Sequence, residues 1–176
     1  MDDVCSIFYQ YPSWYWAAKK TQSKWGMPIS TQMAIIHQES RFNGTAKPPR
    51  ERILWVIPWK RPTSAYGYSQ ALESTWNRYQ RTTHNNGASR NDFADASDFI
   101  GWYGYQLHQK TGVSMSNTYG MYLAYHEGGG GYNRRTYQQK PWLMSVAKKV
   151  QDRAYLYRRQ LRYCAKKIKK PWWNIF

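Results

Sequence analysis

The periodic apolar pattern that follows Pro141 is the sequence feature that most constrains the fold. From Trp142 to Cys164, apolar residues recur every three or four positions, which is the spacing of one face of an α-helix. Proline suits the first helical turn, so Pro141 predicts where this helix begins. The same spacing, bounded by glycine, proline or a capping residue, predicts four further helices. They span about 12–25, 30–40, 91–112 and 116–127, with N-caps expected at Ser30, Asn91 and Ser116 and ends at Gly26, Gly112 and the glycine run 128–131.

One segment interrupts this helical pattern. Residues 48–62 hold four prolines around the apolar run 53–57, which excludes a helix and leaves a loop or a short β-ribbon. The chain of 176 residues has no internal repeat and no linker long enough to divide it. We therefore expect a single, mainly α domain, 1–176, with its core in about 14–160 and a basic, aromatic tail at 165–176.

Composition narrows the class of partner. The formal net charge is +16, from 26 Lys and Arg against 10 Asp and Glu. An aromatic content of 18% excludes a disordered polyelectrolyte, and no apolar run approaches the roughly 18 residues of a membrane span. Nucleic acid, an anionic membrane surface and a bacterial cell wall all fit this charge. Half of the basic residues lie in 134–170, and the run Lys166–Lys170, followed by tryptophans, can contact an anionic membrane.

The two cysteines, Cys5 and Cys164, lie far apart in the chain. They form no CxxC pair, and the four histidines show no HExxH or comparable spacing, so we expect neither a metal site nor a cofactor. The cysteines either form a disulfide in an oxidising compartment or are two separate buried thiols, and we favour the disulfide. No basic and apolar signal segment is visible, so a cytoplasmic protein or a processed form is expected.

Glu39 is the carboxylate with the most unusual surroundings. It follows the apolar body of the helix predicted for 30–40, where partial desolvation and the negative end of the helix dipole both raise its pKa. A carboxyl that keeps its proton near neutral pH is what a general acid for glycosidic cleavage requires. A solvated glutamate at a helix end is the alternative, and position alone favours that alternative.

Three short segments bear on this choice. Residues 38–43 (QESRFN) resemble the Glu-Ser motif of soluble lytic transglycosylase (SLT, family 1) domains, which share a lysozyme-like fold. Residues 65–70 (AYGYSQ) resemble their second motif, Gly-Leu-Met-Gln, and residues 123–130 (LAYHEGGG) resemble the third, Ala-Tyr-Asn before a glycine-rich turn. The three occur in the family's order, each where a helix meets a loop. The chain is thus similar to this family over roughly 14–157, which implies a lysozyme-like fold, mainly α within the α+β type, with a catalytic cleft.

The resemblance implies a peptidoglycan lytic transglycosylase. Glu39 alone would serve as acid and base on the β-1,4 bond between N-acetylmuramic acid and N-acetylglucosamine, leaving a 1,6-anhydro product. Tyr125 would hydrogen-bond and orient Glu39, and Ser40 would line the cleft. The residues that the resemblance places at the substrate are Gly67, Tyr68, Ser69, Gln70 and Glu127.

Departures from the family's pattern leave alternatives open. The segment 48–62 is an insertion, and His126-Glu127 replaces the usual Asn and its neighbour. Glu127 can contact substrate or pair with Arg134 or Arg135 on the surface. As the least favoured option, it is a second catalytic carboxylate, which would make the protein a muramidase that hydrolyses the same bond. A non-catalytic basic module that binds cell wall or nucleic acid is a further alternative.

The resemblance also bears on location and assembly. It implies action in the periplasm or cell envelope of a Gram-negative bacterium, with the outer membrane as a candidate attachment site. Peptidoglycan glycan strands are the expected partner, with an anionic membrane surface as a second partner of the tail. We expect a monomer and no nucleic-acid partner.

Overall fold

The computed structural model of the chain describes residues 2–48 and 64–170, and helices make up most of this part. They are α1 (Val4–Gln10), α2 (Pro12–Trp25), α3 (Ile29–Ser40), α5 (Glu73–Thr83), α6 (Phe93–Thr111), α7 (Thr118–Asn133), η1 (Thr136–Gln139), α8 (Pro141–Cys164) and η2 (Ala165–Lys167). The described residues contain no strand, only an isolated antiparallel bridge between Tyr66 and Ala71. The predicted mainly α fold class is therefore confirmed. None of these helices has the length and apolar character that a membrane span requires.

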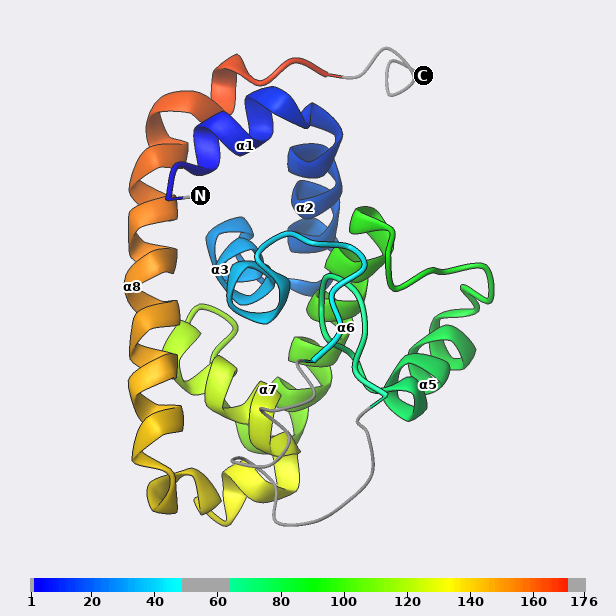
Figure 1. Cartoon of the computed structure of the whole chain (residues 1–176), viewed down its shortest axis with the longest axis vertical. Helices are drawn as coiled ribbons and strands as arrows, with labels where there is room; N and C mark the ends of the chain where they lie inside the picture. Colours follow the sequence, from blue (N-terminus) through cyan, green and yellow to red (C-terminus); the bar gives the residue numbers. More distant parts are fainter. Residues whose placement is uncertain (1, 49–63, 171–176) are drawn as a thin grey trace.

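The centre of the fold is α3. All residues from Ile29 to Ile36 are buried, so this helix is covered on every face along its first two turns. A helix of this kind needs neighbours all round. The helices α8, α2 and α6 pack against it, and Figure 1 shows it in the middle of the molecule with α8 alongside.

A buried amide ties α2, α3 and α6 together. The side-chain N–H group of Gln32 on α3 donates to the backbone carbonyls of Ala18 (3.0 Å) and Met27 (2.8 Å). Its side-chain oxygen accepts a hydrogen bond from the hydroxyl of Ser97 on α6 (2.8 Å). Gln32 is fully buried, and these bonds offset the cost of removing its amide from water.

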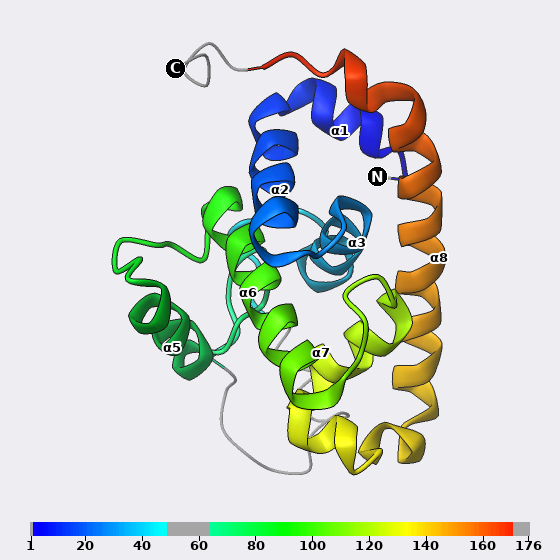
Figure 2. The same cartoon turned by 180° about the vertical axis from the view of Figure 1, so that it is seen from behind.

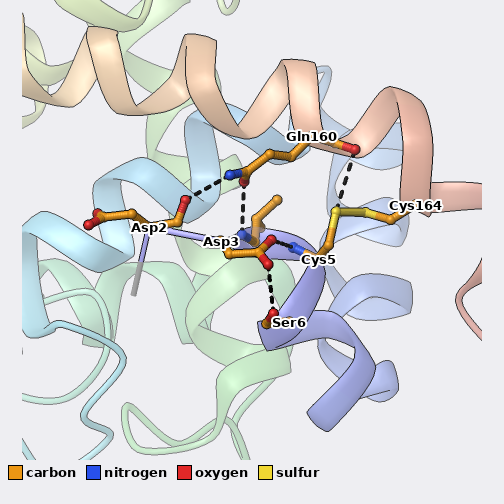
Figure 3. The surroundings of a disulfide bond; sticks show 7 residues. Asp2, Asp3, Cys5, Ser6, Gln160 and Cys164 are labelled. Carbon is orange, nitrogen blue, oxygen red and sulfur yellow. Dashed lines mark hydrogen bonds between the residues drawn. A yellow bond between two sulfur atoms is a disulfide. The ribbon is translucent and has the colours of Figure 1, made fainter.

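The last α-helix, α8, runs the height of the molecule, and α1 packs against its C-terminal end (Figure 2). Cys5 of α1 is bonded to Cys164 of α8, which confirms the predicted disulfide. Figure 3 shows Gln160 of α8 beside this bond: its side-chain carbonyl accepts from the N–H group of Val4 (2.9 Å), and its amide donates to the carbonyl of Asp2 (2.8 Å). The first described residues are thereby fixed to α8.

Two predicted helix ends and the start at Pro141 are confirmed, whereas three predicted caps are wrong by one or two residues. Gly26 and Gly112 end α2 and α6 in the left-handed conformation, with φ of 84° and 74°. At a helix start, the course of the preceding loop decides which residue takes the N-cap position. The observed N-caps are Pro28 for α3, Asp92 for α6 and Asn117 for α7, in place of Ser30, Asn91 and Ser116.

Two predicted segments fall wholly or partly outside the described residues. The possible β-ribbon lies within 49–63, and the aromatic end of the tail lies within 171–176. The described part of the basic tail lies on α2. There the indole N–H group of Trp16 donates to the carbonyl of Lys169 (3.0 Å), and the ammonium group of Lys170 lies 5.3 Å from the centre of the Trp16 ring.

Candidate active site

Glu39 lies in the last turn of α3, where the chain leaves the core. The helix ends because Arg41 and Phe42 both adopt left-handed backbone conformations, with φ of 51° and 62°. The N–H group of Arg41 closes the final turn on the carbonyl of His37 (2.9 Å). Since the preceding turns are buried, the helix carries Glu39 from the core to the wall of a cleft.

This cleft, hereafter the Glu39 cleft, has a volume of about 460 Å³. Burial raises the pKa of Glu39 to about 7, although a hydrogen bond from the hydroxyl of Tyr122 acts in the opposite direction. A carboxyl with this pKa is available near neutral pH both as an acid and as a base. The cleft is lined by Glu39, Ala65, Gln70, Ala71, Leu72, Thr75, Phe99, Tyr103, Tyr125, His126, Glu127 and Gly128.

A tight turn at 66–71 forms part of the wall of the cleft through Gln70 and Ala71. Gly67 has a φ of 79°, and a Cβ atom there would lie 2.0 Å from the carbonyl oxygen of Arg90, so only glycine fits. The N–H group of Gly67 donates to the carbonyl of Ala46 (3.0 Å), and that of Tyr68 donates to the carbonyl of Arg90 (3.2 Å). The glycine of the second motif therefore lets this turn dock on two loops at once.

Gln70 leads from this turn into the cleft. Its side-chain N–H group donates to the carbonyls of Ala46 and Gly67, at 2.9 Å in both cases. The amide nitrogen is thus used to hold the turn, and the side-chain carbonyl oxygen remains as the acceptor that a ligand could reach.

The tyrosine that hydrogen-bonds Glu39 is Tyr122, which the sequence analysis did not single out. The hydroxyl of Tyr125, expected to orient Glu39, donates instead to the backbone carbonyl of Ser69 (2.8 Å). Tyr125 thereby fastens α7 to the turn at 66–71. Residues three apart lie on one face of a helix, so the spacing of the two tyrosines was a signal that could have drawn attention to Tyr122.

Glu127 is the second glutamate of the Glu39 cleft, and its environment is the opposite of that of Glu39. Its side chain is only 4% exposed, and it accepts hydrogen bonds from Lys140 (2.7 Å), from Thr136 and from His126 (3.1 Å). Burial alone would raise the pKa of Glu127, but these donors together hold it below the usual range. The surface pairing with Arg134 or Arg135 that the sequence suggested is wrong, since Lys140 is the partner.

The helix that begins at Thr118 breaks at the first residue of the glycine run, as predicted, but a second helical stretch follows the break within α7. Gly128 interrupts the helix with φ 70° and ψ 161°, and the helical turns then continue to Asn133. Gly128 and Tyr103 border both the Glu39 cleft and a second cavity of about 500 Å³, the Arg78–Lys110 cavity. Within the described part of the chain, Arg78 and Lys110 form no ion pair with a carboxylate.

Four predicted site residues do not line the Glu39 cleft. Ser40 is buried, and its hydroxyl donates to the carbonyl of Ile36 (3.1 Å). Tyr68 packs against Trp14 and Phe93. The remaining two, Gly67 and Ser69, shape the turn through their backbone atoms.

The fold and the site together define a class of protein. It is a helical domain whose cleft holds one carboxyl with a pKa near 7 and one ionised carboxylate. No group of three or more His, Cys, Asp or Glu side chains that could hold a metal ion occurs in residues 2–48 and 64–170.

The family model described as transglycosylase SLT domain matches residues 1–164, and the chain belongs to this family. The resemblance noted from the three short segments is thus confirmed. Neither the curated proteins nor the solved structures include a significant match to the chain. Membership places the protein among the peptidoglycan lytic transglycosylases, whose substrate lies in the cell envelope.

Proposed function

We propose that the protein cleaves the β-1,4 bond between N-acetylmuramic acid and N-acetylglucosamine without water, with Glu39 as the single acid and base. The observation that carries this proposal is the Glu39 carboxyl in its cleft with a pKa of about 7. Near neutral pH such a group is protonated often enough to act as an acid and, once ionised, is basic enough to take a proton back.

The proposed reaction balances with this one group. Glu39 gives its proton to the glycosidic oxygen as the bond from that oxygen to C1 of the muramic acid breaks. The resulting carboxylate takes the proton of the C6 hydroxyl, whose oxygen bonds to C1 and closes the anhydro ring. Glu39 ends protonated, as it began, and the reaction requires no second carboxylate. The substrate's acetamido group would stabilise the cationic centre.

Within this proposal the surrounding residues position the acid. The Tyr122 hydroxyl donates to the carboxylate that forms after proton transfer, which keeps its basicity moderate. Gln70 offers its carbonyl oxygen to a substrate N–H group, and Tyr125 holds the turn that carries Gln70. The Arg78–Lys110 cavity adjoins the cleft at Tyr103. Its two cations suit the carboxylates of a stem peptide.

The proposal is tested by digesting purified sacculi with Glu39→Gln and with the native protein, and by analysing the products by mass spectrometry. We expect anhydro ends from the native protein and no turnover from the variant. Glu73→Gln is the matched control, because Glu73 is an exposed glutamate outside the cleft. Retained anhydro products from Glu39→Gln would refute the assignment.

A muramidase is the second candidate, and the ionised Glu127 in the same cleft is the observation that favours it. A hydrolase needs a carboxylate as base or nucleophile in addition to the acid. Reducing ends without anhydro ends, lost in Glu127→Gln as well as in Glu39→Gln, would establish hydrolysis in place of the lytic reaction.

We further propose a single domain, 1–176, that acts as a monomer in the periplasm or cell envelope of a Gram-negative bacterium. The disulfide supports an oxidising compartment. Fractionation of cells, followed by blotting under non-reducing conditions, tests the proposed location and the oxidising compartment. The oxidised chain is expected in the periplasmic or envelope fraction. Contact of the tail with an anionic membrane stays a prediction, which sedimentation with anionic and neutral vesicles checks.

A further inference from the structure

Trp142 is an exposed aromatic side chain beside the Glu39 cleft, and no step of the proposed reaction uses it. It is the second residue of α8 and is 42% exposed. The centre of its ring lies 5.3 Å from the centre of the His126 ring on α7. His126 lines the Glu39 cleft, whereas Trp142 does not. The indole ring therefore lies at the rim of the cleft, next to His126.

The beginning of α8 is held against α7 by Glu127. Its carboxylate accepts hydrogen bonds from the ammonium group of Lys140, just before α8, and from the hydroxyl of Thr136 in η1. Figure 1 shows the end of α7 and the beginning of α8 at the same end of the molecule. The carbonyl of Lys140 accepts from the N–H group of Leu143 (2.9 Å), so Lys140 is tied to the first turn of α8. This ionised carboxylate thereby fixes the place of Trp142 beside His126.

The contact with His126 leaves a face of the indole ring free. The planes of the two rings are inclined by 77°, so the edge of one ring points at the face of the other. An arrangement of this kind occupies at most one face of the indole. The exposed fraction of Trp142 shows that much of the remaining ring surface is open to solvent.

His126 supplies a polar group at the same place. Its Nδ1 atom lies 3.1 Å from a carboxylate oxygen of Glu127, and an ionised carboxylate can only accept a hydrogen bond. Nδ1 therefore carries the hydrogen, and in the neutral ring Nε2 is left as an acceptor. The His126 side chain is 32% exposed. A flat apolar surface and a hydrogen-bond acceptor are thus adjacent at the rim of the cleft.

An N-acetylhexosamine ring matches both of these groups. A pyranose ring presents C–H groups that pack on the electron-rich face of an indole, and its hydroxyl and acetamido groups supply hydrogen-bond donors. The substrate of the proposed reaction is a polymer of such sugars, and its strand continues beyond the two sugars that flank the broken bond. A strand bound with that bond at Glu39 therefore passes the rim of the cleft.

We propose that Trp142 and His126 form a further sugar-binding site at the rim of the Glu39 cleft, the Trp142 subsite. An N-acetylhexosamine of the glycan strand stacks on the indole ring and donates a hydrogen bond to His126. The choice of ligand rests on the proposed function, but the binding itself does not depend on Glu39 as the catalytic acid.

The probe is the pentamer of N-acetylglucosamine, titrated into the whole, oxidised chain carrying Glu39→Gln, so that cleavage does not consume it. This oligomer is uncharged, so attraction to the net charge of +16 does not contribute to its binding. Adding Trp142→Ala is expected to weaken binding about tenfold in calorimetry, and Trp142→Phe by no more than about threefold. Tyr163→Ala is the matched control, because Tyr163 is an exposed aromatic residue near the other end of α8, and it should leave the affinity unchanged.

NMR gives a direct readout of the contact. The indole N–H resonance of Trp142, identified by its absence from the spectrum of Trp142→Phe, should shift as the pentamer is added. No binding of the pentamer, equal affinities of the Trp142→Ala and Tyr163→Ala proteins, or an unmoved Trp142 resonance at saturation would each overturn the proposal. A failure of the proposed reaction is seen separately, as sacculus digestion without anhydro ends, and leaves these binding measurements unaffected.

Discussion

Replacing Glu39 with glutamine is expected to stabilise the folded protein above neutral pH while abolishing turnover. Burial raises the pKa of Glu39 from its ordinary value of 4.5 to about 7. Each tenfold change in an ionisation equilibrium corresponds to about 1.4 kcal/mol. Ionising Glu39 in the folded state therefore costs up to about 3 kcal/mol more than ionising it in the unfolded chain.

The sign follows from which state holds the proton. Below pH 4.5 the carboxyl is neutral in both states and costs nothing. Between pH 4.5 and 7 the folded state retains the proton that the unfolded chain has lost, so stability falls as pH rises. Glutamine is neutral throughout. The variant should match the native protein at pH 4 and exceed it by up to about 3 kcal/mol at pH 8.

Thermal or urea unfolding of the oxidised proteins at several pH values measures this difference. For a chain of this length, 3 kcal/mol is about 6–12 °C in melting temperature. Burial also lowers the pKa of His37 to about 4, so the histidine titrates over an overlapping range with the opposite effect on stability. Subtracting native from variant cancels that contribution. Glu73→Gln, at an exposed position, should show no such trend. A difference between Glu39→Gln and native protein that does not vary with pH would refute the reasoning.

Three further predictions concern other parts of the structure. The Tyr122→Phe variant loses the hydrogen bond that lowers the pKa of Glu39. The alkaline limb of the pH profile of kcat/KM on sacculi should therefore move up by about one pH unit. An unmoved limb would contradict the hydrogen bond from Tyr122 to Glu39. Gly67→Ala should destabilise the fold by about 2–4 kcal/mol in urea unfolding. Gly87→Ala has open space around the new Cβ atom, so its free energy of unfolding should stay within about 0.5 kcal/mol of the native value. Equal effects of the two variants would contradict the steric crowding at Gly67. Cys5→Ser opens a loop with a sequence separation of 159 and should cost up to about 5 kcal/mol, seen as a lower melting temperature that reducing agent no longer changes.

Much of the fold was predictable because it depends on local sequence. The periodic apolar pattern that follows Pro141 and the glycines at positions 26 and 112 mark helix boundaries through backbone conformation, which neighbouring residues largely decide. The caps were harder, since Asp92 and its neighbour Asn91 are both good caps. Only the course of the loop selects the one whose oxygen reaches the free N–H groups. The helices α1 and α5 were not predicted.

The site was predictable in outline and not in its contacts. The order of the three motif segments identified the family, and the end of an apolar helix marked Glu39 as a carboxyl with a raised pKa. Nothing in the sequence distinguished the roles of Tyr122 and Tyr125, which face the same region from adjacent turns of α7. Nor did it show that Lys140 would neutralise Glu127.

The sequence by itself determined the helical class and the family, since periodicity is a local property and the motif segments are short. It favoured the disulfide, which the structure then showed. The tertiary structure alone decided which groups share a cleft and how each ionises. The pKa of a carboxyl depends on the solvent, charges and donors within a few ångströms. For Glu39, those surroundings come from chain segments distant in sequence. For Glu127, they come from its neighbour His126 and from Thr136 and Lys140, which the fold brings back against α7. Burial leaves the first protonated near neutral pH, and three donors keep the second ionised.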